Sequence, residues 1–263
     1  MEESIFQFWF REAGSIVLDY FVYASAAFVL FYIILKRPMW FRKVQKKMPE
    51  FTDYGRDIMY SLITVTIFAT MALAVFYFLK PYTNTYDSIS EYGWGYYAFT
   101  WVWMLFIHDT YFYWMHRLMH RPKLFKYIHL VHHKSTNPSP WTAYAFHPLE
   151  AVLEVSILPI IAFTLPVHSH AIGWFFLFQI IYNVYGHLGF ELYPKNFHKN
   201  WFGRWVNTSV AHNLHHDKYN GNYGLYFLFG DRMMGTIRED YDATYEATTE
   251  GKNPEVSQPV LVV

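Results

Sequence analysis

The sequence predicts an all-α membrane protein, and three observations lead to this fold class. The 263 residues are 53% hydrophobic and 22% aromatic, and only 16% are charged, whereas soluble domains carry about 25% charged residues. Several stretches approach or exceed the roughly 20 apolar residues that a helix needs to cross a bilayer. Histidines are clustered near the ends of these stretches. We therefore expect four or five transmembrane helices within a single domain, residues 1–263.

The expected membrane helices follow one another along the chain. The five stretches cover residues 15–35, 57–79, 95–117, 151–165 and 171–189. The fourth is the shortest and contains Pro159, so it either crosses the membrane or forms a hairpin with the fifth. We expect N-terminal membrane helices in residues 1–100, a catalytic region with the histidines in residues 101–240, and a C-terminal tail in residues 241–263.

Basic residues in the connecting segments indicate the orientation. The segment between the first two stretches contains Lys36, Arg37, Arg42, Lys43, Lys46, Lys47 and Arg56. The segment after the second stretch has Lys80 against Asp87 and Glu91. Because basic residues collect on the cytoplasmic side of membrane proteins, we expect the first segment there, with the basic segments after the third and fifth stretches. All histidine clusters then lie at the cytoplasmic face of the membrane.

Three histidine clusters have the spacing of metal ligands. They are HRLMH at residues 116–120, HLVHH at residues 129–133 and HNLHH at residues 212–216. On a helix, positions i, i+3 and i+4 lie on one face, so we expect each cluster to direct its imidazoles to one place. Neutral imidazole binds iron, zinc, copper and nickel. The clusters offer more ligands than one four-coordinate ion uses, which predicts two metal ions sharing a site.

Acidic residues near the clusters are candidates for supporting the ligands. If the third stretch continues as a helix of about 3.6 residues per turn, Asp109 points in nearly the same direction as His116 and His120. A metal-bound imidazole usually donates its second N–H to a carboxylate or a carbonyl oxygen. We therefore expect Asp109 to act on the ligands, with Glu150 and Asp217 as further candidates.

Longer motifs around the histidines carry a family resemblance. They are DTYFYWMHRLMH at residues 109–120, the HLVHH cluster, FHPLE at 146–150, GHLGFELYP at 186–194, and HNLHHDKYNGNYG at 212–224 followed by FGDRMMGT at 229–236. In order and spacing they resemble the fatty acid hydroxylase and sterol desaturase superfamily of integral-membrane di-iron oxygenases. The resemblance implies a bundle of transmembrane helices with a cytosolic helical cap, and a histidine-rich iron pair at their junction.

The resemblance assigns the metal ligands to particular residues. It implies ligands at His116, His120, His129, His132, His133, His187, His212, His215 and His216. Some members have a further histidine where this chain has Glu191, four residues after His187. On a helix Glu191 would face the same way as His187. That coordination position is open, filled by water, or taken by Glu191.

The resemblance also implies the chemistry and the partners. Two iron ions, with O2 as co-substrate, would oxidise an unactivated C–H bond of a membrane lipid, such as a fatty acyl chain or a sterol. Hydroxylation is the leading interpretation and desaturation is the alternative. The chain has no cysteine and no GxGxxG motif, which excludes a Cys-bound iron–sulfur cluster and disfavours a bound dinucleotide. We therefore expect a separate electron donor of the ferredoxin or cytochrome b5 type on the basic cytoplasmic face.

Other classes of protein fit the sequence less well. A zinc protease would carry HExxH, which is absent from the sequence. A metal transporter would place polar residues near the middle of its membrane helices, so a non-catalytic metal-binding or transport protein is the third hypothesis. The net charge is zero, and no basic motif indicates binding to nucleic acid.

Overall fold

The computed structural model describes residues 3–251 and is built from helices. In these residues no strand forms, and extended pairing is limited to the isolated bridges Lys43–Phe190, Tyr86–His168 and Val206–Phe227. The expected all-α class is therefore confirmed. Short 3-10 turns connect the helices at Trp40–Arg42, Lys80–Tyr82, Ile89–Glu91, Pro140–Tyr144, Phe197–Lys199 and Gly203–Trp205.

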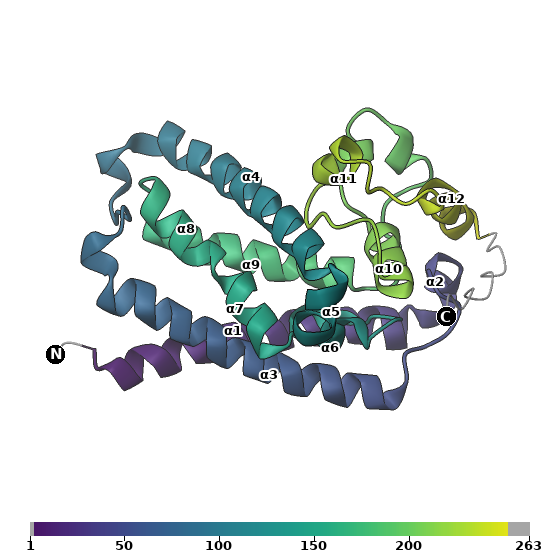
Figure 1. Cartoon of the computed structure of the whole chain (residues 1–263), viewed down its shortest axis with the longest axis horizontal. Helices are drawn as coiled ribbons and strands as arrows, with labels where there is room; N and C mark the ends of the chain where they lie inside the picture. The colour runs from purple at the N-terminus through teal and green to yellow at the C-terminus, as the bar shows by residue number, and fades with distance from the viewer. Residues whose placement is uncertain (1–2, 252–263) are drawn as a thin grey trace.

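Four long helices run side by side through the body of the molecule (Figure 1). They are α1 (Ile5–Phe28), α3 (Phe51–Leu73), α4 (Gly93–Met119) and α9 (Ser169–Gly186). Ser4 begins α1 because its side chain accepts a hydrogen bond from the Gln7 N–H and the Gln7 side chain accepts one in return. Both α1 and α3 continue in π-helical form, through Val29–Ile34 and Ala74–Phe78.

The surfaces of the long helices indicate a membrane protein. Two helices, Ile5–Ile34 and Phe51–Phe78, are long and apolar enough to cross a bilayer. Large apolar side chains on α1 and α4 are exposed, among them Phe10 at 66% and Phe106 at 68%. A soluble protein rarely exposes such a surface. The expected number of four or five crossings stays a prediction.

The fourth expected stretch consists of two short helices. Helix α7 (Pro148–Val155) ends just before Ser156, and α8 (Ile157–Thr164) begins directly after it. Pro159 lacks the N–H that would donate to the carbonyl oxygen of Val155, so a continuous helix loses a hydrogen bond here. The chain then turns into α9, and the choice between a crossing and a hairpin stays a prediction.

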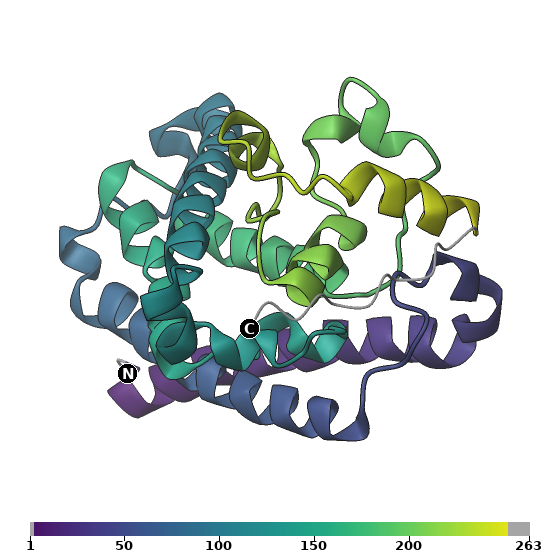
Figure 2. The same ribbon diagram turned by 45° about the vertical axis from the view of Figure 1, so that its right-hand side comes forward.

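Shorter helices gather at one end of the long ones and form what we call the end region (Figures 1 and 2). It comprises α5 (Pro122–Ile128), α6 (Leu130–His133), α10 (Ser209–Lys218), α11 (Phe229–Met233) and α12 (Tyr241–Glu250), with the four-residue α2 (Lys36–Met39) beside them. The segment expected to be a tail from residue 241 thus begins with a helix, because Tyr241 and Tyr245 are buried against α10. The rest of the expected tail, from residue 252, lies outside the described residues.

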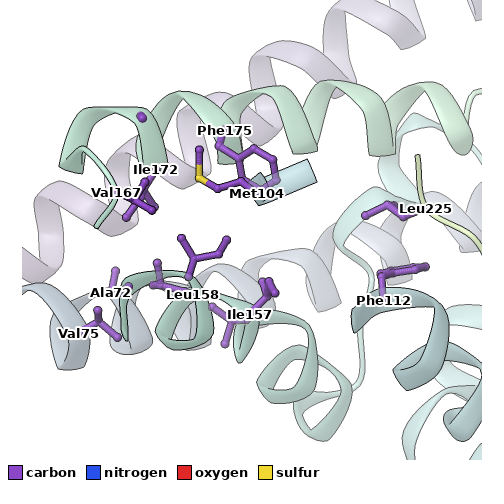
Figure 3. Close-up of a cluster of buried hydrophobic side chains, with 14 of the residues drawn as sticks. Ala72, Val75, Met104, Phe112, Ile157, Leu158, Val167, Ile172, Phe175 and Leu225 are labelled. Atoms are coloured by element: carbon purple, nitrogen blue, oxygen red, sulfur yellow. The ribbon is translucent and has the colours of Figure 1, made fainter. Parts of the chain in front are cut away.

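A core of apolar side chains holds the long helices together (Figure 3). Val75 comes from the π-helical continuation of α3, and α4, α8 and α9 supply Met104, Ile157 and Phe175. Each of these side chains is at most 1% exposed. Lipid tails are as apolar as these side chains, so within a bilayer close van der Waals packing holds such helices together. The same core reaches Phe112, whose ring packs against His116 at 5.0 Å between centroids. It therefore supports the histidines directly.

Candidate metal centre

The nine histidines that the sequence singles out lie close together, where the long helices meet the end region. They form two groups, and within each group the ligand nitrogens lie within 4.8 Å of one another. The five-histidine group contains His116, His120, His129, His133 and His215, and the four-histidine group contains His132, His187, His212 and His216. The two groups adjoin, since the ring centroids of His133 and His216 are 4.8 Å apart. Each group could hold one metal ion.

The second and third clusters each divide their histidines between the two groups. His129 and His133 enter the five-histidine group, whereas His132 enters the four-histidine group. In the third cluster the first and last histidines join the four-histidine group and the middle one joins the other. The expectation that each cluster points to one place is therefore wrong for these two. Consecutive helical residues point about 100° apart, so the adjacent histidines of an HH pair reach different ions.

Local sequence explains how the first two clusters meet. His116 lies in the last turn of α4, and His120 is the residue that ends it. Arg121 is extended because it precedes Pro122, which begins α5. The chain reverses there and brings His129 back beside α4, so that its Nε2 lies 3.0 Å from the Nε2 of His116.

The remaining ligands come from α9 and α10. His187 is the residue that ends α9. Thr208 begins α10, its side chain accepting a hydrogen bond from the Ala211 N–H at 3.1 Å. Every residue from Ser209 to His216 is buried. Because α10 is surrounded on all sides, it can direct histidines to both groups.

The Nε2 atoms have the spacing of ligands around an ion. In the five-histidine group the contacts are His116–His129 at 3.0 Å, His120–His215 at 3.1 Å and His120–His133 at 3.1 Å. In the four-histidine group they are His132–His187 at 3.2 Å, His187–His212 at 2.9 Å and His212–His216 at 3.2 Å. Two nitrogens bound at right angles to one metal, each about 2.1 Å from it, are about 3.0 Å apart.

Hydrogen bonds to Nδ1 orient five of the rings and favour a metal between them. The Nδ1 atoms of His116, His187, His215 and His216 donate to the carbonyl oxygens of Tyr223, Asn183, Gly221 and Ser135, at 2.7–3.0 Å. The Nδ1 of His129 donates to Glu150 Oε1 at 2.7 Å. Because each of these oxygens accepts a hydrogen bond, the ring proton lies on Nδ1 and Nε2 keeps its lone pair. Lone pairs facing one another at about 3 Å repel, and a cation between them removes the repulsion.

Burial keeps the imidazoles in the neutral form that metals bind. The exposed fraction is 5% or less for every histidine of the two groups except His120, which is partly exposed. Burial, reinforced by the neighbouring imidazoles, lowers the pKa of all six histidines of the second and third clusters well below its usual value. The lone pairs are thus available without competition from protons.

The three candidate carboxylates behave differently. Glu150 is fully buried in the first turn of α7 and contacts His129, as a supporting residue should. Asp217 instead pairs with the neighbouring Lys218 at 2.9 Å. Of the three, only Glu150 meets the expectation.

Asp109 was expected to support a ligand, and this expectation is wrong. Its Oδ1 accepts hydrogen bonds from the backbone N–H groups of Tyr226 and Phe227, at 2.9 and 3.1 Å. It precedes His116 by seven residues, about 10 Å along α4, which places it beside the segment after α10 instead of beside an imidazole. Asp109 therefore fastens that segment to α4.

Glu191 was considered as a ligand, and the structure contradicts this. Glu191 would face the same way as His187 only on a helix through both residues, but α9 ends at Gly186 and Gly189 has a φ of +70°. The Glu191 carboxylate accepts hydrogen bonds from the N–H groups of Tyr193 and Val210 and from the Tyr185 hydroxyl. Burial raises its pKa to about 7. It belongs to neither histidine group.

Sequence reasoning missed the residues that hold the rings through their backbone. Tyr223 is one of them, because its carbonyl oxygen accepts from His116. Asp231 in turn fixes this segment by accepting from the N–H groups of Tyr223 and Gly224, both at 2.8 Å. A carbonyl oxygen is common to every residue and leaves no sequence signal. Asp231 lies in the FGDRMMGT motif, which pointed to the segment without indicating its role.

The fold and the site define a helical membrane protein with a histidine-rich centre that could hold two metal ions. The sequence profile of the fatty acid hydroxylase family matches residues 101–236, which contain all nine histidines and the segment that holds His116. The chain belongs to this family, within the superfamily of fatty acid hydroxylases and sterol desaturases.

Curated relatives extend the similarity beyond that region. The chain is 27% identical to a Delta(7)-sterol 5(6)-desaturase of Gibberella zeae, over 90% of this chain and 74% of the relative. It is 27% identical to the lathosterol oxidase of Rattus norvegicus, over 89% and 75%. A Delta(7)-sterol 5(6)-desaturase of Aspergillus fumigatus is 32% identical over 58% of this chain and 52% of the relative. No solved structure matches the chain.

Proposed function

We propose that this protein is a membrane-bound di-iron oxygenase that uses O2 and external electrons to hydroxylate an unactivated C–H bond of a lipid. The observation that carries the proposal is the convergence of nine Nε2 atoms into two adjoining groups. When bound there, two iron ions would supply the reduction of O2 and the oxidising power to break a C–H bond. The five-histidine and four-histidine groups would each hold one of them.

The protein's own residues orient the ligands and keep water out. Glu150 and four backbone carbonyl oxygens hold the rings through Nδ1. Phe112 packs on His116, and Phe146 packs on His132 at 5.2 Å between centroids. A dry, apolar wall of this kind protects a strong oxidant from side reactions.

The membrane arrangement is part of the proposal. We infer four or five crossings, with the end region and the metal centre on the cytoplasmic face. The basic residues between α1 and α3 support this orientation. So does the position of both histidine groups at the same end of α4 and α9, beside the end region.

A basic surface beside the metal centre suits a reduced protein partner. Helix α5 carries exposed Lys123 and Lys126, with Arg121 just before it. On the inner side of the same helix, Phe125 packs against the rings of His120 and His133. We infer that an acidic ferredoxin or cytochrome b5 type donor docks on α5, because complementary charge speeds such encounters.

Desaturation is the second candidate function. The relatives from Gibberella zeae and Aspergillus fumigatus are named sterol desaturases, and the rat relative a sterol oxidase. Removing a second hydrogen in place of returning oxygen would produce an alkene at the same site. The two outcomes share the metal centre and differ in the product alone.

Metal analysis and lipid analysis together test the proposal. The wild-type chain and His132→Ala would be purified in detergent, and iron, zinc and haem absorption measured for each. We expect about two irons per chain, no haem band, and clear loss of iron in the variant. Lipids of cells expressing each form, grown under labelled O2, should contain a labelled hydroxyl group with the wild type only.

The possible results separate the hypotheses. An alkene without label would establish the desaturase. Zinc as the sole metal, or full iron content in His132→Ala, would contradict the oxygenase and favour the metal-binding or transport hypothesis.

A further inference from the structure

A cavity of about 640 Å³ lies among the long helices, between α1, α3, α4, α7, α8 and α9. Much of its wall is apolar, with Phe68, Val155, Leu158 and Ile172 among the lining residues. Its volume is that of a pocket for a lipid-sized molecule. Phe146 lines the cavity and also packs against His132, so the cavity adjoins the four-histidine group.

A buried acidic side chain of this cavity, that of Glu154, has no partner among the residues that the structure describes. Glu154 is 7% exposed and lines the cavity. Across residues 3–251 its carboxyl group makes no hydrogen bond and no ion pair. A polar group buried without a partner costs about 1–3 kcal/mol, and the fold gains nothing visible in return. This is the behaviour of a group that awaits a ligand.

Two further polar side chains line the same cavity from other helices. Tyr144 donates to Gln179 Oε1 at 3.0 Å, and the described residues offer no acceptor to the amide nitrogen of Gln179. The Tyr226 hydroxyl meets His108 Nδ1 at 3.1 Å, and His108 Nε2 has no partner in that part of the chain. If the hydroxyl donates to Nδ1, Nε2 carries the proton and is a donor. His108, Glu154 and Gln179 thus combine two donors with one carboxyl group.

These residues lie toward the metal end of the cavity. His108 and Gln179 each precede a predicted ligand, His116 and His187, by eight residues, which is about 12 Å along a helix. Glu154 follows Glu150 by one helical turn on α7. Charged residues line the other end of the cavity. Arg11 lies near the start of α1, and Lys80 lies just beyond the π-helical continuation of α3, both away from the histidines.

We propose that His108, Glu154 and Gln179 are specificity-determining residues that recognise a hydroxyl group on the lipid substrate. This rests on the proposed function, because the lipid that they would hold is the molecule that the metal centre oxidises. A hydroxyl both donates and accepts, so it satisfies the carboxyl group and the two N–H donors together. An ammonium group would leave both donors unmatched, and an anion would face Glu154 and Asp19, which lines the same cavity.

Competition binding tests the inference without turnover. The purified, metal-loaded full chain would bind tritiated cholesterol in the absence of an electron donor. The competitors would be cholesterol, its analogue lacking the hydroxyl, hexadecanol, hexadecane and hexadecylamine. We expect each alcohol to compete at least tenfold better than its matched hydrocarbon or amine, because a site built around a hydroxyl rejects analogues that leave its polar groups unpaired.

Variants connect that preference to the residues. In Glu154→Leu and Gln179→Leu the ratio of the affinity for the alcohol to that for the matched hydrocarbon should fall toward one. Glu154→Gln can still pair with a hydroxyl and should keep most of the preference for the alcohol. The control is Val152→Ala, on the exposed face of α7, and this variant should keep the full preference for the alcohol. Metal content and elution volume identify folded protein, and Gln179→Leu carries the test if Glu154→Leu does not fold.

Several results would overturn the inference. They are equal binding of alcohol and hydrocarbon by the wild type, a preference that survives both leucine variants, and stronger competition by the amine. If the chain still holds two irons, any of these results refutes the hydroxyl site and leaves the proposed function standing. A chain that binds no iron refutes the proposed function instead.

Discussion

The two histidine groups lie side by side but differ in their ligands and surroundings. The five-histidine group includes the partly exposed His120 and the carboxylate-supported His129. The four-histidine group is fully buried, and its rings are held by backbone carbonyl oxygens where a partner of Nδ1 is present. The first group adjoins basic α5, and the second adjoins Phe146 and the cavity. We infer that electrons enter beside the first and the lipid approaches the second.

The largest expected effect is loss of a metal from the smaller group. His187→Ala leaves three ligands there, whereas His120→Ala leaves four in the other group. We expect His187→Ala to hold about one metal per chain and to lose lipid oxidation. His120→Ala should retain more metal than His187→Ala. Metal quantification on detergent-purified protein checks this, and the reverse order would show that ligand number does not govern affinity here.

The next effect concerns the carboxylate found in the five-histidine group. Glu150→Gln weakens the acceptor for His129 Nδ1, so metal affinity should fall about 10- to 100-fold, and for one of the two ions only. A chelator titration that follows release of each metal measures it. Glu191→Gln is the matched control, since Glu191 is equally buried but contacts no ligand. An equal loss of metal affinity in both variants would contradict a ligand-supporting role for Glu150 alone.

A smaller effect is expected for the carboxylate that fastens the segment after α10. Asp109→Asn weakens the acceptor for two backbone N–H groups, which should lower the free energy of unfolding by about 1–3 kcal/mol. Metal content should stay at the wild-type value, because no imidazole contacts Asp109. Thermal unfolding and metal analysis on the same sample check both points. Loss of one metal with unchanged stability would restore Asp109 to the role that its helical position suggested.

The smallest effect is expected on the exposed surface. The double change Lys123→Glu and Lys126→Glu on α5 should slow reduction by an acidic donor roughly two- to tenfold at low salt, and less at high salt. Stopped-flow reduction at two ionic strengths measures it. Lys80→Glu, at the far end of α3, is the control and should leave the rate unchanged. If the rate of reduction does not change in the double variant of α5, the electron donor docks on another surface.

The sequence by itself determined the helical class, the family and the candidate ligands. Spacing alone could select these histidines, because metal binding needs a residue type that is uncommon and must recur at helical intervals. The apolar stretches were also visible, since crossing a bilayer requires a length that few soluble segments reach. Both signals are local in the chain.

Only the tertiary structure decided how these residues are used. It divided the adjacent histidines His132 and His133 between two groups, and it assigned ligand support to Glu150 instead of Asp109. It also ended α9 before Glu191 and turned that carboxylate toward backbone N–H groups. A carboxylate can accept a hydrogen bond from an imidazole or from a backbone amide, and it can also bind a metal. The choice therefore depends on which partner the packing of distant helices brings within about 3 Å, and the linear sequence does not contain that distance.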